Sequence, residues 1–187
     1  MTVPVQRRAL FVDRDGTLNP DLHYLKEAER LELYRGVGRA LRFAHAQGWL
    51  VVCVTNQSGV ERGFYSAEDV DRIHARLNER LAAEGSRVDA FYYCPHAPER
   101  QCACRKPGTL LFERAVRDWS IDLPSSAIIG DRVLDAEAGR RLGMLVAQVR
   151  TPDQAPDVAA EFERRGIVAD IRADSFEGAT VRVLARG

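Results

Sequence analysis

The stretch Ala9-Leu-Phe-Val-Asp13-Arg-Asp15-Gly16-Thr17 decides the fold of this chain. A short apolar run that stops at polar turn residues is typical of a buried strand in a parallel sheet. Alternate residues of an extended chain point the same way, so the carboxylates of Asp13 and Asp15 can face one site. Gly16 permits a sharp turn directly after the pair. The stretch therefore predicts a buried strand that delivers two carboxylates to its carboxyl end.

The rest of the chain alternates short apolar runs with amphipathic segments. Further strands are predicted over residues 50–54, 88–93, 127–129, 144–149 and 168–171. Helices are predicted over residues 36–47, 66–85 with Ser66 as N-cap, 109–119 with Thr109 as cap, 135–142, 157–165 and from 175 onward. This order predicts an α/β fold with an open, doubly wound parallel sheet, Rossmann-like, in which ligands bind beyond the carboxyl ends of the strands.

Length and charge limit the classes of function. The 187 residues suit one α/β domain, so we predict a single domain over residues 1–187. Lys and Arg together equal Asp and Glu at 27 each, which argues against nucleic-acid and anionic-membrane partners. No apolar run approaches the roughly 20 residues of a membrane span, and no signal peptide is evident. We expect a cytoplasmic protein and a monomer.

Polar clusters follow four of the predicted strands. Thr55-Asn-Gln-Ser58 follows the second strand, Arg105 and Lys106 come after the third, and Asp131 and Asp135 come after the fourth. Each cluster alone fits an ordinary turn, a helix cap or a solvated lysine. Their joint occurrence at successive strand ends favours one site on one edge of the sheet. No large insertion separates the clusters, so a separate cap domain over that site is not expected.

Three of these carboxylates suit a divalent cation. Asp13, Asp15 and Asp131 would repel one another unless a cation lay between them. Mg²⁺ prefers oxygen ligands and keeps waters and a substrate phosphate in its shell.

The four clusters, from about Leu10 to Asp135, resemble the four motifs of the haloacid dehalogenase superfamily of phosphatases. The resemblance implies that Asp13 is the nucleophile and forms an aspartyl-phosphate. It implies that Asp15 is the general acid and then the base for the attacking water. Thr55 and Lys106 match residues that hold the phosphoryl oxygens.

The resemblance also implies a magnesium site. Asp131 matches the Mg²⁺ ligand of the last motif, with Asp13 and the backbone carbonyl of Asp15 as the other protein ligands. Asp135 matches a second acidic position, which would act through water or by orienting Lys106. Arg132 is a supporting candidate beside them.

A second metal site is predicted between residues 94 and 104. Cys94, His96, Cys102 and Cys104 supply three sulfurs and one imidazole within eleven residues. Cys₃His is a common set for tetrahedral structural zinc, and four protein ligands leave no position open for catalysis. A disulfide plus a free thiol is the alternative, which a reducing compartment disfavours.

This zinc loop, with Arg105-Lys106-Pro directly after it, resembles that of D-glycero-D-manno-heptose 1,7-bisphosphate phosphatases and of the related histidinol-phosphate phosphatases. The resemblance implies a small phosphorylated substrate, with removal of the C7 phosphate of the heptose as the first expectation. The substrate-binding candidates are Asn19, Asn56, Gln57, Ser58 and Arg105.

Three alternatives stay open. Histidinol phosphate would need acidic or apolar contacts, whereas Arg62, Arg105 and Arg132 favour a bisphosphate. A nucleic-acid 3′-phosphatase shares the Thr-Asn-Gln pattern, but the neutral charge counts against it. A zinc-stabilised binding module without catalysis is disfavoured by the intact motif residues.

Overall fold

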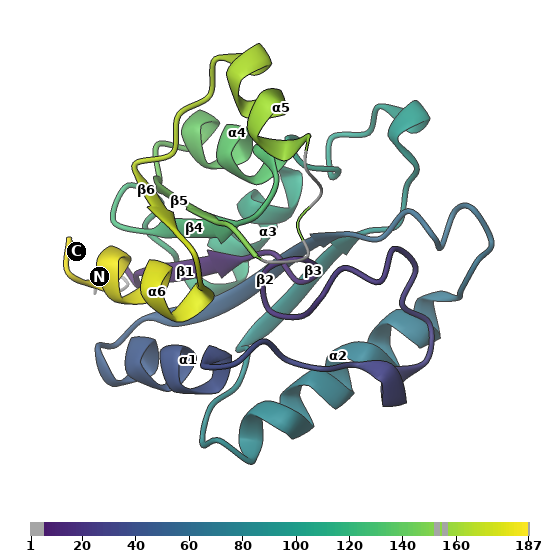
Figure 1. Cartoon of the computed structure of the whole chain (residues 1–187), viewed down its shortest axis with the longest axis horizontal. Coiled ribbons are helices and arrows are strands. Elements are labelled where there is room, and N and C mark those ends of the chain that lie inside the picture. The colour runs from purple at the N-terminus through teal and green to yellow at the C-terminus, as the bar shows by residue number, and fades with distance from the viewer. Residues whose placement is uncertain (1–5, 152–153, 155–156, 187) are drawn as a thin grey trace, which may run out of the picture.

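A parallel sheet organises the chain, as the computed structural model describes it for residues 6–151, 154 and 157–186 (Figure 1). Six strands pair in the order β3-β2-β1-β4-β5-β6, and every pairing is parallel. The strands are β1 (Ala9–Val12), β2 (Leu50–Asn56), β3 (Ala90–Cys94), β4 (Ala127–Gly130), β5 (Leu145–Val149) and β6 (Ile171–Ala173). The predicted doubly wound α/β architecture is confirmed.

Helices cover both faces of this sheet. The α-helices are α1 (Val37–Ala46), α2 (Ala67–Ala82), α3 (Leu110–Trp119), α4 (Val133–Arg141), α5 (Val158–Arg165) and α6 (Phe176–Leu184). Short 3₁₀ turns lie at Ala28–Arg30 and Pro98–Arg100. Helices α1, α2 and α6 lie on one side of the sheet, and α3, α4 and α5 lie on the other (Figure 1).

Two apolar layers explain why the strand sequences are continuously hydrophobic. Leu10 and Val12 of β1 belong to the core layer that also contains residues of α1, α2 and α6. Ala9 and Phe11 belong to the opposite layer, where Phe11 meets Phe112 of α3 edge to face at 5.2 Å. All four residues of β1 are buried, as expected for a central parallel strand covered on both faces.

The strand order places the candidate site. The chain runs outward from β1 to β3 on one side and then from β4 to β6 on the other. The crevice beyond the carboxyl ends of β1 and β4 is therefore the topological switch point, where doubly wound proteins bind ligands. The Asp13 N–H donates to the Ile129 carbonyl at 3.1 Å, which joins the two strand ends there.

Several predicted boundaries are wrong. Strand β6 begins at Ile171 and not at Val168. The Asp170 carboxylate accepts a hydrogen bond from the Val146 N–H, and the Val168 side chain is exposed. Thr109 is the N-cap residue of α3, as predicted, but its side chain makes no capping hydrogen bond, because its hydroxyl donates to the Glu113 carboxylate at 2.7 Å. Helix α4 begins at Val133, since Asp135 lies in its first turn and accepts from the Arg132 N–H at 3.1 Å.

The Ser66 cap is confirmed, because its hydroxyl accepts from the Asp69 N–H and Asp69 in turn accepts from the Ser66 N–H. The segments that connect β1 to α1 and β2 to α2 contain turns and one 3₁₀ turn, so the part of the chain that the structure describes has no separate cap.

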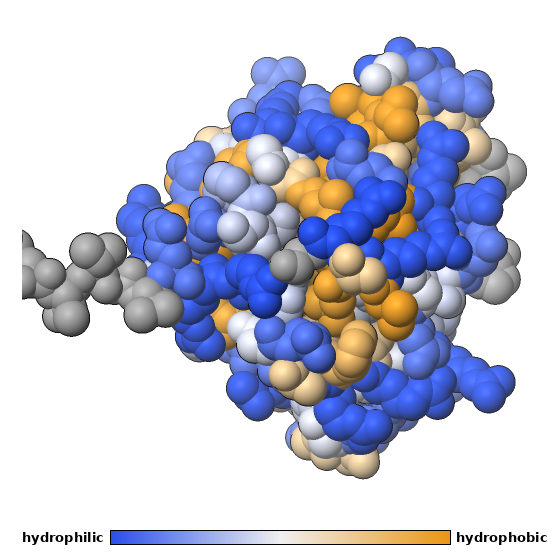
Figure 2. Space-filling view, turned by 90° about the vertical axis from the view of Figure 1, so that its left-hand side faces the viewer, coloured by the Kyte–Doolittle hydropathy of each residue, from blue (hydrophilic) through white to orange (hydrophobic). Residues whose placement is uncertain are grey.

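Among the residues that the structure describes, none of the helices combines the length and the hydrophobicity of a membrane-spanning segment. On the side where Figure 1 places the chain ends, hydrophilic residues surround smaller hydrophobic patches (Figure 2).

Candidate active site

Three carboxylates meet at the switch point. Asp13 follows β1, Asp131 follows β4 and Asp135 lies in the first turn of α4, and each places an oxygen within 4.8 Å of the others. All three side chains are buried. Burial raises the pKa of Asp13 to about 6, against the opposing effect of Lys106. Burial and repulsion by Asp13 and Asp135 raise the pKa of Asp131 well above its usual value.

This donor set fits a hard divalent cation. Mutual repulsion in a buried space is relieved when a cation lies between the carboxylates. Gly16 has a φ of +79°, and a Cβ there would lie 2.5 Å from Asp131 Oδ2. The absence of a side chain at Gly16 therefore lets Asp131 approach the turn after Asp13 and Asp15.

Lys106 completes the acidic cluster from a different part of the chain. Its Nζ lies 2.8 Å from Asp13 Oδ1 and 2.5 Å from Asp135 Oδ1, and it donates to the Val54 carbonyl at 2.6 Å. Burial alone would lower the pKa of Lys106, but Asp13 and Asp135 together raise it well above its usual value. The ammonium is thus charged, and it lies between the carboxylates of Asp13 and Asp135.

Asn56 fixes the backbone of Lys106. The Lys106 N–H donates to Asn56 Oδ1 at 3.0 Å, and Asn56 Nδ2 donates to the Lys106 carbonyl at 3.3 Å. Because Asn56 ends β2, this pair ties the loop that carries Lys106 to the sheet.

Asp15 has a different environment from Asp13. Arg14 donates to both of its oxygens, at 3.1 and 2.7 Å, while Asn19 donates to Oδ1 and Gln57 to Oδ2, each at 2.9 Å. Burial would raise the pKa of Asp15, but the Arg14 charge and these hydrogen bonds lower it. The sequence predicted that the carboxylates of Asp13, Asp15 and Asp131 would lie together. In the structure the third carboxylate of this group belongs to Asp135, and the Asp15 side chain lies outside it.

Arg14 is itself almost fully buried, at 1% exposure. Its Nη1 lies 3.4 Å from His74 Nε2, and the His74 ring stacks on Phe91 with centroids 4.3 Å apart. Burial and the Arg14 charge lower the pKa of His74 to about 3, so the imidazole is neutral and its Nε2 can accept from Arg14.

A cavity of about 280 Å³ opens over these groups. It is lined by Asp13, Asp15, Asp21, His23, Thr55, Asn56, Arg105, Lys106, Arg132, Leu134, Asp135 and Glu161. Arg132 lies 3.2 Å from Asp131 and 3.1 Å from Asp21, so it links the acidic cluster to the loop after β1.

The predicted substrate-binding residues divide into two groups. Asn56 and Arg105 line the cavity, whereas Asn19, Gln57 and Ser58 are not part of its lining. Asn19 and Gln57 direct their amides at Asp15 instead.

Sequence reasoning missed Arg14, His74 and Tyr65. The signal for Arg14 was available, because a cation at the end of a central buried strand requires an acidic partner.

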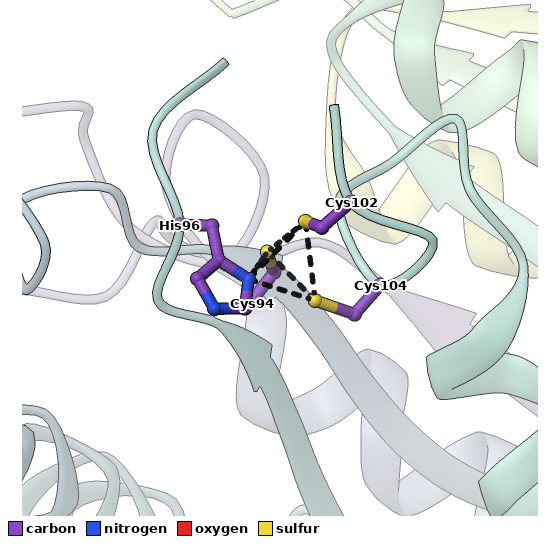
Figure 3. Close-up of side chains that lie close together, drawn as sticks. All are labelled: Cys94, His96, Cys102 and Cys104. Carbon is purple, nitrogen blue, oxygen red and sulfur yellow. Dashed lines mark hydrogen bonds between the residues drawn. The ribbon is translucent and has the colours of Figure 1, made fainter. Parts of the chain in front are cut away.

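The Cys/His cluster forms a closed tetrahedron of donors (Figure 3). All six separations among the Sγ atoms of Cys94, Cys102 and Cys104 and Nδ1 of His96 fall between 3.1 and 3.7 Å. Zinc bonds of about 2.0–2.3 Å would place tetrahedral donors about 3.5–3.8 Å apart. The cysteines are free, at distances well beyond the roughly 2.05 Å of a disulfide. The cluster is consistent with a zinc site, and the disulfide alternative is excluded for this structure.

The Cys/His cluster directly precedes, in sequence, two residues that line the cavity. Arg105 follows Cys104, and its Nη1 donates to the His96 carbonyl at 3.2 Å. The turn that follows is tight, because a Cβ at Gly108 would lie 2.3 Å from the Ala103 carbonyl oxygen. Ordering of the Cys/His loop therefore helps to place Arg105 and, together with Asn56, the backbone of Lys106.

The sheet order and the converging strand ends define a class, the doubly wound α/β proteins with a buried carboxylate directly after the first strand. Comparison with known families gives a match over residues 103–174 to the HAD-hydrolase-like family.

Curated relatives extend that match. The D-glycero-beta-D-manno-heptose-1,7-bisphosphate 7-phosphatase of Haemophilus ducreyi is 38% identical over 166 residues, 85% of this chain and 90% of the relative. The Helicobacter pylori enzyme with that name is 41% identical over 133 residues, 71% of this chain and 77% of the relative. The chain belongs to the haloacid dehalogenase superfamily and is a phosphatase of it.

A solved structure agrees with these relatives. The D,D-heptose 1,7-bisphosphate phosphatase of B. bronchiseptica, complexed with magnesium and phosphate, aligns with a TM-score of 0.83 and 27% identity. The alignment covers 96% of this chain and 99% of that protein. The superfamily resemblance seen in the sequence is thereby confirmed.

Proposed function

We propose that this protein is a magnesium-dependent phosphatase that removes the C7 phosphate of D-glycero-D-manno-heptose 1,7-bisphosphate. The observation that carries the proposal is the contact of Lys106 with Asp13 beside Asp131 and Asp135, in a chain about 40% identical to heptose-bisphosphate 7-phosphatases. The Lys106 ammonium and three carboxylates lie together beyond the carboxyl ends of the strands. Such an arrangement suits transfer of a phosphoryl group rather than binding alone.

Asp13 is the nucleophile of this proposal. One of its carboxylate oxygens attacks phosphorus, and the bond from phosphorus to the leaving alkoxide breaks. Lys106 lies 2.8 Å from Asp13 Oδ1, so its charge is close to the phosphoryl oxygens as the new bond forms. Thr55, which also lines the cavity, would donate to the same oxygens.

Asp15 is the general acid and base of this proposal. It gives a proton to the leaving alkoxide and later accepts one from the water that hydrolyses the aspartyl-phosphate. The hydrogen bonds from Arg14, Asn19 and Gln57 favour its anion, and the negative charge of an arriving phosphate opposes them by raising its pKa.

Magnesium would be held by Asp13, Asp131 and the backbone carbonyl of Asp15, with Asp135 keeping Lys106 in place. When bound, it neutralises the negative charge of the carboxylates and of the phosphate. Zinc in the Cys/His loop would be structural, because all four donors come from the protein and none is left open.

Two lining features bear on the substrate. Arg105 and Arg132 offer planar cationic groups that suit a second phosphate. Asp21 and Glu161 line the same cavity and would suit a cationic substrate such as histidinol phosphate, which is the second candidate.

The decisive experiment measures kcat/KM with Mg²⁺ for both heptose 1,7-bisphosphate anomers and for histidinol phosphate. We expect one bisphosphate to be preferred by about 100-fold, which is about 2.7 kcal/mol of transition-state binding. A preference for histidinol phosphate would reject the heptose substrate and leave the chemistry in place.

Asp13→Asn is the control variant, because it removes the nucleophile from a site where burial already disfavours the charge. It should fold normally and lose turnover of every substrate. Turnover that survives in this variant would reject Asp13 as the nucleophile.

A further inference from the structure

We propose that Tyr65 is a positioning residue for the general acid–base group, acting on Asp15 through the Gln57 side chain. This inference rests on the proposed role of Asp15 in proton transfer. It does not depend on which phosphate ester the enzyme prefers.

A chain of short hydrogen bonds joins the three residues. The Tyr65 hydroxyl donates to Gln57 Oε1 at 2.7 Å. Gln57 Nε2 then donates to Asp15 Oδ2 and to Thr55 Oγ1, at 2.9 Å each. A primary amide has a donor end and an acceptor end, so holding Oε1 at Tyr65 directs the donor end at Asp15.

Burial makes this arrangement strict. Gln57 is 2% exposed and Tyr65 is 7% exposed, so neither can exchange the partner for bulk water. A buried acceptor that loses its donor carries the full cost of desolvation, which drives the side chain to another position. Without the Tyr65 hydroxyl, Gln57 would therefore leave its place at Asp15.

Tyr65 is well anchored to perform this role. Its ring packs against the Gly59 backbone, where a Cβ would lie 2.3 Å from the ring. The Tyr24 ring centroid lies 6.4 Å from that of Tyr65 and 4.5 Å from that of Phe64, which it meets edge to face. The next residue, Ser66, caps α2. The hydroxyl is thus held by the two loops that border the site.

The asymmetry around Asp15 shows what Gln57 contributes. Arg14 contacts both oxygens and Asn19 contacts Oδ1, whereas Gln57 contacts Oδ2. Loss of the Gln57 contact would leave Oδ2 with Arg14 as its one side-chain donor among the described residues and would allow the carboxyl group to turn. Proton transfer is sensitive to such a turn, because the acid must lie within hydrogen-bond reach of the leaving oxygen.

The test is Tyr65→Phe, which keeps the ring and removes the hydroxyl. The parameter kcat/KM reports on steps up to formation of the aspartyl-phosphate, where Asp15 acts as acid. We expect kcat/KM to fall about 10-fold for glycerol phosphate, whose alkoxide needs a proton, and less than about 3-fold for p-nitrophenyl phosphate, whose phenolate leaves readily. Equal losses on both esters would indicate a merely structural role and overturn the proposal.

Two further variants keep the result decisive. Tyr92→Phe is the matched control, because the Tyr92 hydroxyl also donates at 2.7 Å, to Asp118 on α3, away from the cavity. It should leave both rates unchanged. Gln57→Leu should show the same selectivity for the leaving group as Tyr65→Phe, and the double variant should be no worse than Gln57→Leu alone. Losses that add in the double variant would show that Tyr65 does not act through Gln57.

The design separates this inference from the proposed function. Turnover of p-nitrophenyl phosphate by the unaltered protein, and its loss in Asp13→Asn, tests the phosphatase assignment. The ratio of the two esters in Tyr65→Phe tests the positioning role.

Discussion

Two cations, Arg14 and Lys106, lie almost completely buried at this site, at 1% and 3% exposure. Each is held by carboxylates that the chain delivers from strand ends, Asp15 for Arg14 and both Asp13 and Asp135 for Lys106. Burial of unpaired charge is prohibitively costly, so these pairs fix each side chain in one position. At the residue scale, the buried cations and carboxylates of the site neutralise one another, and this pairing determines where each side chain lies.

His74 leads to a prediction on pH dependence. Its pKa is about 3 when folded, against about 6.5 for an unperturbed imidazole. Below about pH 6.5 the unfolded chain binds a proton that the folded chain excludes, so stability falls as the pH falls. Each pH unit in that window costs about 1.4 kcal/mol, or about 2 kcal/mol between pH 6.5 and pH 5. Asp13 and Asp131, whose pKa values are raised by burial, act in the opposite direction over the same window, so the His74 contribution is the difference between the unaltered protein and a His74 variant in urea unfolding at pH 7 and pH 5.

The variant His74→Gln retains an acceptor for Arg14 and removes the titration. Its loss of stability between pH 7 and pH 5 should be smaller than that of the unaltered protein. Parallel losses in the two proteins would show that His74 does not titrate as its burial implies.

Sequence reasoning predicted the residues whose place is set by local geometry. Asp13, Lys106 and Asp131 follow apolar runs, so their convergence follows from the parallel sheet. Tyr65 and His74 could not be predicted in the same way, since their contacts depend on how α2 and its preceding loop pack against Asp15 and Arg14.

At the scale of elements, the loop between β3 and α3 contains no large aliphatic or aromatic side chain that could hold it in place. Cys94, His96, Cys102 and Cys104 hold this loop together, and the distances between their donor atoms suit a zinc ion. Because Lys106 lies two residues beyond Cys104, we expect zinc removal to lower stability first and activity as a consequence.

Cys102→Ser is the matching variant. We expect it to lose bound zinc, measured by elemental analysis, and to unfold at a lower temperature. Cys53→Ala is the control, since Cys53 is buried in β2 outside the cluster and its removal should leave the zinc content unchanged. A zinc-free protein that stays fully stable but inactive would contradict a structural role.

The prediction of elements succeeded where burial alone defines them. Strands β1 and β2 are covered on both faces, so their apolar runs mark them clearly. Strand β6 was misplaced by three residues, because side-chain contacts of Arg140 with Val168 and Asp170 hold the segment before it outside the sheet. Such contacts join distant parts of the chain and leave no local pattern.

At the scale of the whole molecule, the helix layers stabilise the sheet while the strand ends carry the chemistry. Phe176 of α6 is 2% exposed in the layer shared with α1 and does not line the cavity. Phe176→Ala should therefore cost about 3–5 kcal/mol of unfolding free energy in urea. The value of kcat/KM, measured at 20 °C where the variant is still folded, should change less than about 3-fold.

Phe43 on α1 provides the control, because it is 44% exposed and its replacement by Ala should cost less than about 0.5 kcal/mol. A parallel loss of stability and kcat/KM in Phe176→Ala would mean that the helix layers shape the site as well as support it. Separate responses would follow from the fold described here, since Asp13, Asp131 and Lys106 are fixed by strand ends and by one another rather than by α6.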